Sequence, residues 1–162
     1  MPLPPNRPFR KKPGSPREPA YISLDADVFT KEWAENSALT ALSAKALHSV
    51  GVLRHWTEGQ VVLSRGQSTS TALLLVKGRL RVSVTTPEGE EQLLRWMLPG
   101  EISGLSSVFA ETTYPADLVA VGPTQVLHIE RARLVDLINR DPAVSVDLLR
   151  ILGLRINQLF DT

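Results

Sequence analysis

The side chains of this sequence best suited to metal binding or acid–base chemistry at neutral pH are three histidines, His48, His55 and His128. No two of them have the i, i+4 spacing that places two imidazoles on one face of a helix, and no cysteine is present to complete a metal site. His48 is expected near the end of a helix and His128 in a strand. The sequence therefore predicts neither a metal centre nor a haem site.

Serine and carboxylate clusters are the next candidates for chemistry. The segment 104–108 (GLSSV) places a serine two residues after a glycine, but the second glycine of a nucleophile elbow is missing. Glu88, Glu90 and Glu91 crowd a predicted hairpin tip, where exposure to water is the ordinary explanation of such a cluster. No catalytic set is recognisable, and we expect that the protein is not an enzyme.

Composition excludes several further classes of protein. The 162 residues contain no cysteine, so disulfides, cysteine nucleophiles, zinc–thiolate sites and iron–sulfur clusters are ruled out. No apolar run approaches the ~18 residues of a membrane-spanning helix, and the N-terminus lacks the apolar region of a secretory signal. A cytoplasmic location is the expectation.

The net charge of +1 is unevenly distributed along the chain. Residues 1–24 carry five basic residues against one acidic residue, whereas residues 25–162 carry thirteen against sixteen. The acidic balance of the body argues against a nucleic-acid-binding surface there. Residues 1–24 also hold seven of the twelve prolines and few apolar side chains, which predicts a disordered, Pro-rich basic tail. A basic arm that contacts phosphates or a partner is the alternative.

The rest of the sequence divides by its periodicity. In residues 25–50, apolar residues recur at three- and four-residue spacing, which predicts N-terminal helices. Ser43 is expected to cap the second of them, and Gly51 to end it. In residues 51–129, which hold eight of the ten glycines, short apolar or alternating segments stand between the glycines.

This glycine-rich region predicts a mainly β fold, an antiparallel sandwich or barrel flanked by helices. A hairpin tip is expected at 86–90 (TPEGE), because glycine there can adopt a positive φ. The predicted strands include 60–63, 72–76, 80–84, 93–97 and 125–129.

Residues 130–162 return to a helical period and predict two C-terminal helices, one over 130–140 and one that begins at Pro142 after Asp141. The apolar band of the second helix is broader than a small barrel needs, and wide apolar surface usually marks a partner. A helix packed only on its own barrel is the alternative. The expected homodimer contacts are Val144, Leu148, Ile151, Leu152, Arg155 and Leu159, with Leu149, Ile156 and Phe160 widening the band.

Five pieces of the sequence stand in a particular order: 58–66 (EGQVVLSRG), 74–82 (LLVKGRLRV), 88–94 (EGEEQLL), 98–105 (LPGEISGL) and 126–129 (VLHI). In order and spacing they resemble the effector domain of the CRP/FNR family of bacterial transcription regulators, which has the cyclic-nucleotide-binding fold. The resemblance extends over about three-quarters of the chain. It implies a jelly-roll β-barrel with flanking short helices, followed by a long C-terminal dimerisation helix.

In this family a winged helix-turn-helix domain that binds DNA normally follows the long helix. The sequence ends at Thr162 without such a segment. We therefore expect a sensory and dimerisation domain that meets DNA only through a domain missing from this chain. The alternative is a stand-alone regulatory or protein-interaction module. A helix-turn-helix downstream of Thr162 in the gene would favour the first interpretation, and a stop codon there would favour the second.

Members of the family that bind cyclic nucleotides use a short cassette: a glycine whose neighbouring N–H groups hold the phosphate, a glutamate next to it for the ribose, and an arginine about ten residues later for the phosphate. Here Gly104 keeps the glycine, but Leu105 and Tyr114 stand at the glutamate and arginine positions. Cyclic AMP is therefore not the expected ligand. The predicted lining of this degenerate site is Gly104, Leu105, Ser106, Ser107, Tyr114, Pro115 and Ala116.

The cassette is closer to the FNR branch of the family, whose members have lost the nucleotide contacts. That branch senses oxygen through an iron–sulfur cluster on N-terminal cysteines, and this sequence has no cysteine. The resemblance thus implies no cofactor. It leaves a small-molecule effector as a candidate partner without identifying it.

Overall fold

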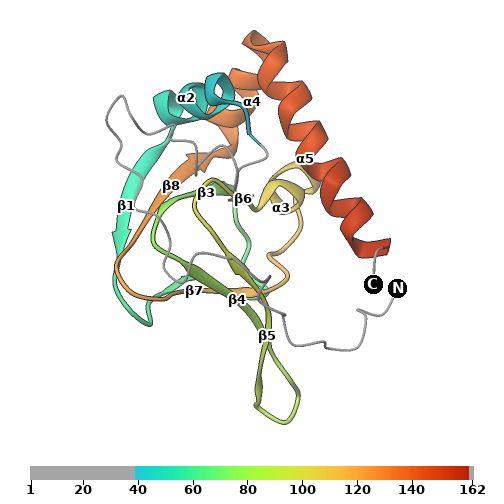
Figure 1. Ribbon diagram of the computed structural model, residues 1–162. Helices are drawn as coiled ribbons and strands as arrows, with labels where there is room; N and C mark the ends of the chain where they lie inside the picture. Colours follow the sequence, from blue (N-terminus) through green and yellow to red (C-terminus); the bar gives the residue numbers. More distant parts are fainter. Residues whose placement is uncertain (1–38, 161–162) are drawn as a thin grey trace.

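The computed structural model describes residues 39–160 and has the predicted fold, an antiparallel jelly-roll barrel with flanking helices and a long C-terminal helix (Figure 1). The predicted tail over 1–24 and the helical segment over 25–38 lie outside the described residues.

Eight strands within residues 39–160 form two four-stranded antiparallel sheets, with strand orders β1-β8-β3-β6 and β2-β7-β4-β5. Neighbours that are not consecutive in sequence mean that the chain crosses repeatedly between the sheets, as in a jelly roll. The strands are β1 (Val52–Trp56), β2 (Val61–Leu63), β3 (Thr71–Lys77), β4 (Leu80–Thr85), β5 (Glu91–Met97), β6 (Ile102–Ser103), β7 (Asp117–Ala120) and β8 (Thr124–Glu130).

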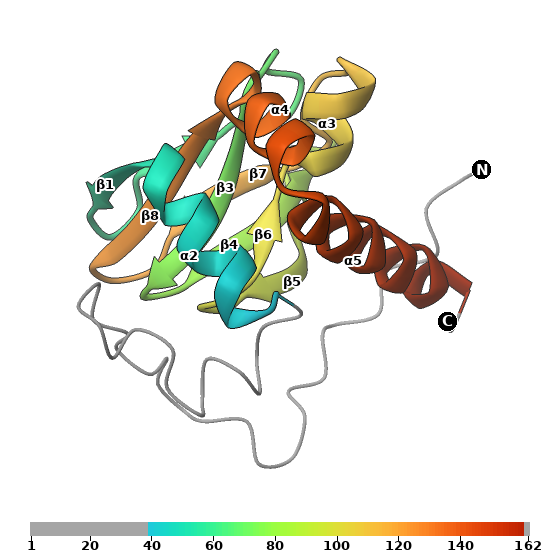
Figure 2. The same ribbon diagram turned by 90° about the horizontal axis from the view of Figure 1, so that it is seen from above.

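Strand β3 separates two hydrophobic clusters, because successive side chains of a strand point to opposite faces. Ala72, Leu74 and Val76 pack in the cluster beneath the helices, whereas Leu73 and Leu75 pack between the two sheets. Helices α2 and α4 lie over the β1-β8-β3-β6 sheet (Figure 2). The helices are α2 (Ala41–Val50), α3 (Leu105–Ala110), α4 (Arg131–Arg140) and α5 (Pro142–Phe160).

The segments predicted as strands coincide with β2, β3, β4, β5 and β8, and the hairpin between β4 and β5 is confirmed. At its tip, the Thr86 amide donates to the Glu90 carbonyl at 2.8 Å and Gly89 adopts a φ of 87°. The sequence analysis did not name β1, β6 or β7. The last two have only two and four residues, too few for an alternating pattern to stand out.

Helix α2 begins earlier than predicted. Its N-cap residue is Thr40 rather than Ser43. The Thr40 side chain accepts a hydrogen bond from the Ser43 amide at 3.2 Å. Gly51 ends the helix as predicted, but with a φ of −97° rather than a left-handed conformation. A glycine is needed at this position because a Cβ there would lie only 2.6 Å from Cγ of Leu127.

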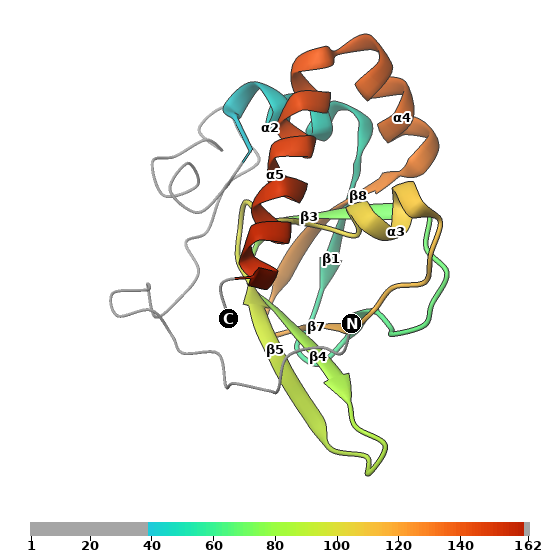
Figure 3. The ribbon, with the colours of Figure 1, turned by 90° about the vertical axis from the view of Figure 1, so that its right-hand side faces the viewer.

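The C-terminal helices follow the predicted boundaries. Helix α4 buries Leu134 and Leu137 against the helix-side cluster, and α5 begins at Pro142. Figure 3 shows α5 running from α4 along the barrel toward β5. Among the described helices, none is long and apolar enough to cross a membrane.

Gly78, in the turn between β3 and β4, offers a test of this topology. Its φ is +91°, and a Cβ would lie 2.5 Å from the Pro123 carbonyl oxygen. We expect Gly78→Ala to lower the free energy of unfolding by about 3 kcal/mol, since both a left-handed backbone and a clash are imposed. Urea denaturation measures the loss.

The matched control is Gly89→Ala at the hairpin tip. Its φ is similar at +87°, but nothing lies within 4 Å of the added Cβ. This variant is expected to lose only about 1 kcal/mol, from the backbone conformation alone. Equal losses in the two variants would contradict the close approach of Pro123 to Gly78.

Candidate effector site

The predicted cassette begins at Gly104, which is the N-cap residue of α3. It adopts a φ of +85°, and a Cβ would lie 3.1 Å from the carbonyl oxygen of Thr71 on β3. Glycine therefore serves here both for its left-handed conformation and for the close packing of α3 on the sheet. The Gly104 carbonyl accepts from the Val108 amide at 2.9 Å, which starts the short helix.

Some of the predicted lining residues are buried in the core, and others are exposed. Leu105 is fully buried in the helix-side cluster, and Ser107 is buried with its hydroxyl 3.4 Å from the Thr113 carbonyl. Ser106 and Pro115 are exposed, whereas Ala116 is buried between the sheets. Leu105 thus points into packed apolar surroundings, so the glutamate position of the cassette is part of the protein core.

Tyr114 stands at the position predicted to correspond to the arginine of the cassette. Its side chain is buried, and its hydroxyl lies 2.6 Å from the hydroxyl of Ser103 on β6. Burial raises the pKa of Tyr114, an effect opposed by the Ser103 hydrogen bond and by the charges of Arg95 and Arg155. The phenol is therefore neutral at physiological pH. Two polar atoms inside the barrel satisfy each other in this way.

A charged cluster lies next to this hydroxyl pair. Arg95 on β5 forms an ion pair with Glu101 at 2.9 Å, and the same Glu101 oxygen accepts from the Leu98 amide at 3.1 Å. Arg155 on α5 is half-buried, and its pKa is lowered by burial and by Arg95 and raised by Glu101 and Tyr114. Two guanidinium groups and one carboxylate therefore converge where α5 passes the barrel.

This cluster changes the electrostatic picture that the sequence suggested. The segment predicted as the cassette, residues 104–116, contains no cation able to face an anionic ligand. The fold supplies Arg95 from β5 and Arg155 from the long helix. Among the described residues, no carboxylate lies within 4 Å of the Arg155 guanidinium. The only sequence clue is a charged residue inside the apolar run of β5.

Three of the predicted dimer contacts lie in the interior of their own chain. Val144, Leu148 and Ile151 are buried in the core of their own chain, together with residues of α2 and α4, so they are not available to a second copy. Leu152 packs against the same cluster. Arg155 belongs to the charged cluster described above, and the side chain of Leu159 lies outside the described part of the chain.

The exposed apolar face of α5 lies elsewhere on the helix. Val146, Leu149, Ile156 and Phe160 are 65%, 67%, 54% and 73% exposed. With Gly153, which has nothing within 4 Å of a Cβ position, they follow alternating three- and four-residue spacing. This is the spacing of a seam between two helices. We call these five residues the α5 stripe. Leu149, Ile156 and Phe160 were predicted only to widen the apolar band of the helix.

The sequence of this domain matches the family model of the cyclic nucleotide-binding domain over residues 53–141. This match covers more than half of the chain, and together with the fold it places the protein in a known class. The chain belongs to the cyclic nucleotide-binding domain family.

Individual relatives fall into two groups. The CRP-like cAMP-activated global transcriptional regulator of Mycobacterium tuberculosis is 27% identical over 76% of this chain and 53% of its own length. The lysophospholipase nte1 of Aspergillus niger is 26% identical over 76% of this chain but only 8% of its own. The crystal structure of the Thermus thermophilus catabolite activator protein superposes with a TM-score of 0.68 at 28% identity, covering 74% of this chain and 56% of that one. The chain thus spans about half of the regulators it matches and a small part of the lysophospholipases.

The Tyr114–Ser103 hydroxyl pair can be tested by a double-mutant cycle. Tyr114→Phe leaves the Ser103 hydroxyl buried without its partner, so we expect a loss of about 1–2 kcal/mol in the free energy of unfolding. Adding Ser103→Ala removes the stranded hydroxyl, and the double variant should lose less than the sum of the two single variants. Additive losses, measured by urea denaturation, would mean that the two hydroxyls do not interact.

Proposed function

We propose that this domain is the sensory and dimerisation part of a CRP/FNR-type transcription regulator, and that its cyclic-nucleotide cassette is degenerate. The observation that carries the proposal is the closed interior of the cassette, where Leu105 is part of the core and Tyr114 pairs with Ser103. A phosphate-binding arginine and a ribose-binding glutamate are replaced by groups that carry no charge.

The loss of binding free energy that this replacement causes supports the proposal. A buried charge-assisted hydrogen bond contributes several kcal/mol to binding, and both such contacts of the cassette are lost here. Tyr114 and Pro115 at the arginine position are also what favours the FNR branch over the nucleotide-binding branch. We infer that the effector is a small molecule other than a cyclic nucleotide, or a partner protein, that acts where the cassette meets α5.

The charged cluster suggests how effector binding at the cassette would change the position of α5. Arg155 on α5 lies within electrostatic range of Glu101 and Tyr114, so one side chain connects the long helix to the cassette. An effector that changes the charge or position of Glu101 or Tyr114 would change the most favourable position of Arg155. A shift of α5 would then reorient whatever follows the helix.

Dimerisation through α5 is the second part of the proposal. Large apolar side chains exposed along one helical stripe favour burial against a partner. Because the α5 stripe has the spacing of a two-helix seam, a second copy of this chain related by a two-fold axis is the simplest partner. Gly153 in its middle lets the two backbones approach closely.

A regulatory module within a larger protein of another class is the second candidate. It is favoured by the match to lysophospholipases, in which the similar segment is a small fraction of the length. The sequence of the gene beyond Thr162 separates the two candidates, since only the first requires a DNA-binding domain there.

The degenerate cassette makes a direct prediction about nucleotides. Titration calorimetry with cyclic AMP and with cyclic GMP should detect no binding tighter than ~10 µM, because no charged group faces the phosphate from the cassette itself. A dissociation constant below that value for either nucleotide would overturn the interpretation of Leu105 and Tyr114.

The α5 stripe makes a prediction about assembly. The wild-type protein should sediment as a dimer at micromolar concentration, and Leu149→Glu should sediment as a folded monomer because it puts a charge in the seam. The control is Leu42→Glu, which changes a still more exposed leucine on α2 (78% exposed) and should leave the dimer intact. A monomeric wild-type protein would contradict the proposal, as would dimers unaffected by Leu149→Glu.

A further inference from the structure

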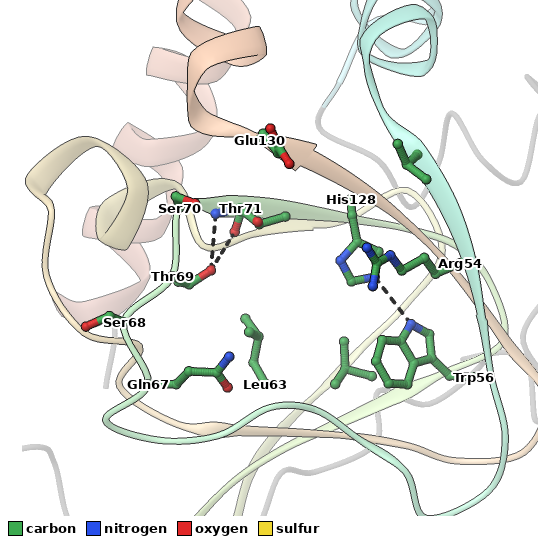
Figure 4. Close-up of a pocket in the computed structure, with 12 residues that line it drawn as sticks. Arg54, Trp56, Leu63, Gln67, Ser68, Thr69, Ser70, Thr71, His128 and Glu130 are labelled. Atoms are coloured by element: carbon green, nitrogen blue, oxygen red, sulfur yellow. Dashed lines mark hydrogen bonds between the residues drawn. The ribbon is translucent and has the colours of Figure 1, made fainter.

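A cavity of about 380 Å³ opens between β1 and the segment that joins β2 to β3 (Figure 4). None of the residues predicted for the cassette lines it. One wall is made by β1 and β8 and the opposite wall by residues 67–71, and Val62 and Leu63 of β2 also line the cavity. The cavity therefore lies beside the edge strands β1 and β2 of the two sheets, and we call this opening the mouth of the barrel. Concave openings of this kind are common places for small-molecule sites.

The strand wall holds a pair of rings with a defined hydrogen bond. The Trp56 indole N–H donates to Nε2 of His128 at 3.3 Å, and the ring centroids lie 5.8 Å apart. Burial, and then the charge of Arg54, lower the pKa of His128 to about 4. The imidazole is thus neutral at physiological pH. With Nε2 accepting from Trp56, its proton resides on Nδ1.

Arg54 stands on the same wall as the two rings (Figure 4). Among the described residues, no carboxylate lies within 4 Å of its guanidinium. Arg54 is exposed at the edge of the cavity, and its charge contributes to the lowered pKa of His128. A cation with no carboxylate partner within residues 39–160, at the edge of an aromatic wall, matches a ligand that carries one negative charge and a flat apolar body.

The opposite wall is polar and neutral. The Gln67 Oε1 accepts from the Ser64 amide at 3.1 Å, which leaves the Gln67 amide N–H groups for other partners. Thr69 accepts from the Thr71 amide at 3.1 Å through its hydroxyl. Together with the hydroxyl of Ser68, these groups can bind a polar edge of a ligand. They add no charge to the site.

Glu130, at the end of β8, determines how an anionic ligand can be oriented in the cavity. Figure 4 shows it at the side of the cavity next to α4, whereas Arg54 and Trp56 lie beside His128. A ligand carboxylate would be repelled by Glu130 and attracted by Arg54. The charges of the cavity therefore permit an anion only at the β1 end.

We propose that the mouth of the barrel, a site separate from the cassette, binds a small organic carboxylate with a planar apolar body. The carboxylate pairs with Arg54, and the body packs against Trp56 and the apolar side chains of Val62 and Leu63, which line the cavity. The cavity is large enough for a single ring with a short side chain and lies in the range of small-ligand pockets.

Three probes that share one body test the charge requirement. Phenylacetate is an anion, phenylacetamide is its neutral isostere, and phenethylamine is a cation. Each is titrated into the 15N-labelled full chain and followed by amide and Trp56 indole chemical shifts. We expect phenylacetate to shift residues of β1 and 67–71 with a dissociation constant on the order of 1 mM or tighter. Phenylacetamide should bind roughly tenfold more weakly, and phenethylamine should not bind there.

Two variants locate the site. Arg54→Gln should weaken phenylacetate binding roughly tenfold and remove the preference over phenylacetamide. Arg133→Gln, which changes an exposed arginine of α4, is the matched control and should leave binding unchanged. Because Arg54 is exposed, its loss should leave the spectrum of the folded protein intact.

Three outcomes would overturn the proposal: no shifts at the cavity with phenylacetate, equal binding of phenylacetate and phenylacetamide, or equal binding to wild type and Arg54→Gln. None of them depends on the dimer or on the nucleotide titration. The carboxylate site and the proposed function can therefore fail separately.

Discussion

The burial of one face of α5 is the constraint on which the functional geometry depends. Val144, Leu148 and Ile151 enter the helix-side cluster, and at 3.6 residues per turn this fixes the rotation of the helix about its axis. Arg155, four residues after Ile151, is then directed to the barrel and to Glu101. The α5 stripe is left exposed by the same rotation. The cassette contact and the proposed dimer seam are thus two consequences of one packing arrangement.

A buried carboxylate holds this arrangement in place. Asp147 is 5% exposed and accepts from the Thr40 amide at 2.7 Å, while Arg150 donates to its other oxygen at 2.7 Å. Burial alone would raise the pKa of Asp147, but the hydrogen bonds from Thr40, Arg150 and Ser43 outweigh it and lower the pKa. Since Thr40 is the N-cap of α2, this side chain ties the start of α2 to the first turns of α5.

Local sequence signals predict turns and helix starts, but periodicity does not show which face of a helix is buried. Glycines with a positive φ and the Asp141–Pro142 step mark turns and a helix start locally, so the hairpin and the beginning of α5 could be predicted. The rotation of α5 could not, because a helix with apolar residues on two faces gives the same pattern whichever face is buried. Arg95 was missed for a related reason: β5 meets α5 only in the folded chain, 60 positions apart in sequence.

The cavity and the cassette share a wall. Within residues 67–71, the Gln67 carbonyl accepts from the Tyr114 amide at 2.9 Å, and Ser68 forms an isolated bridge with Thr113. The Thr71 carbonyl lies against Gly104 at the start of α3. A ligand that draws this segment toward Arg54 would therefore also move Tyr114 and Gly104. Because such coupling is reciprocal in free energy, an effector at the cassette would alter affinity at the barrel mouth by the same factor.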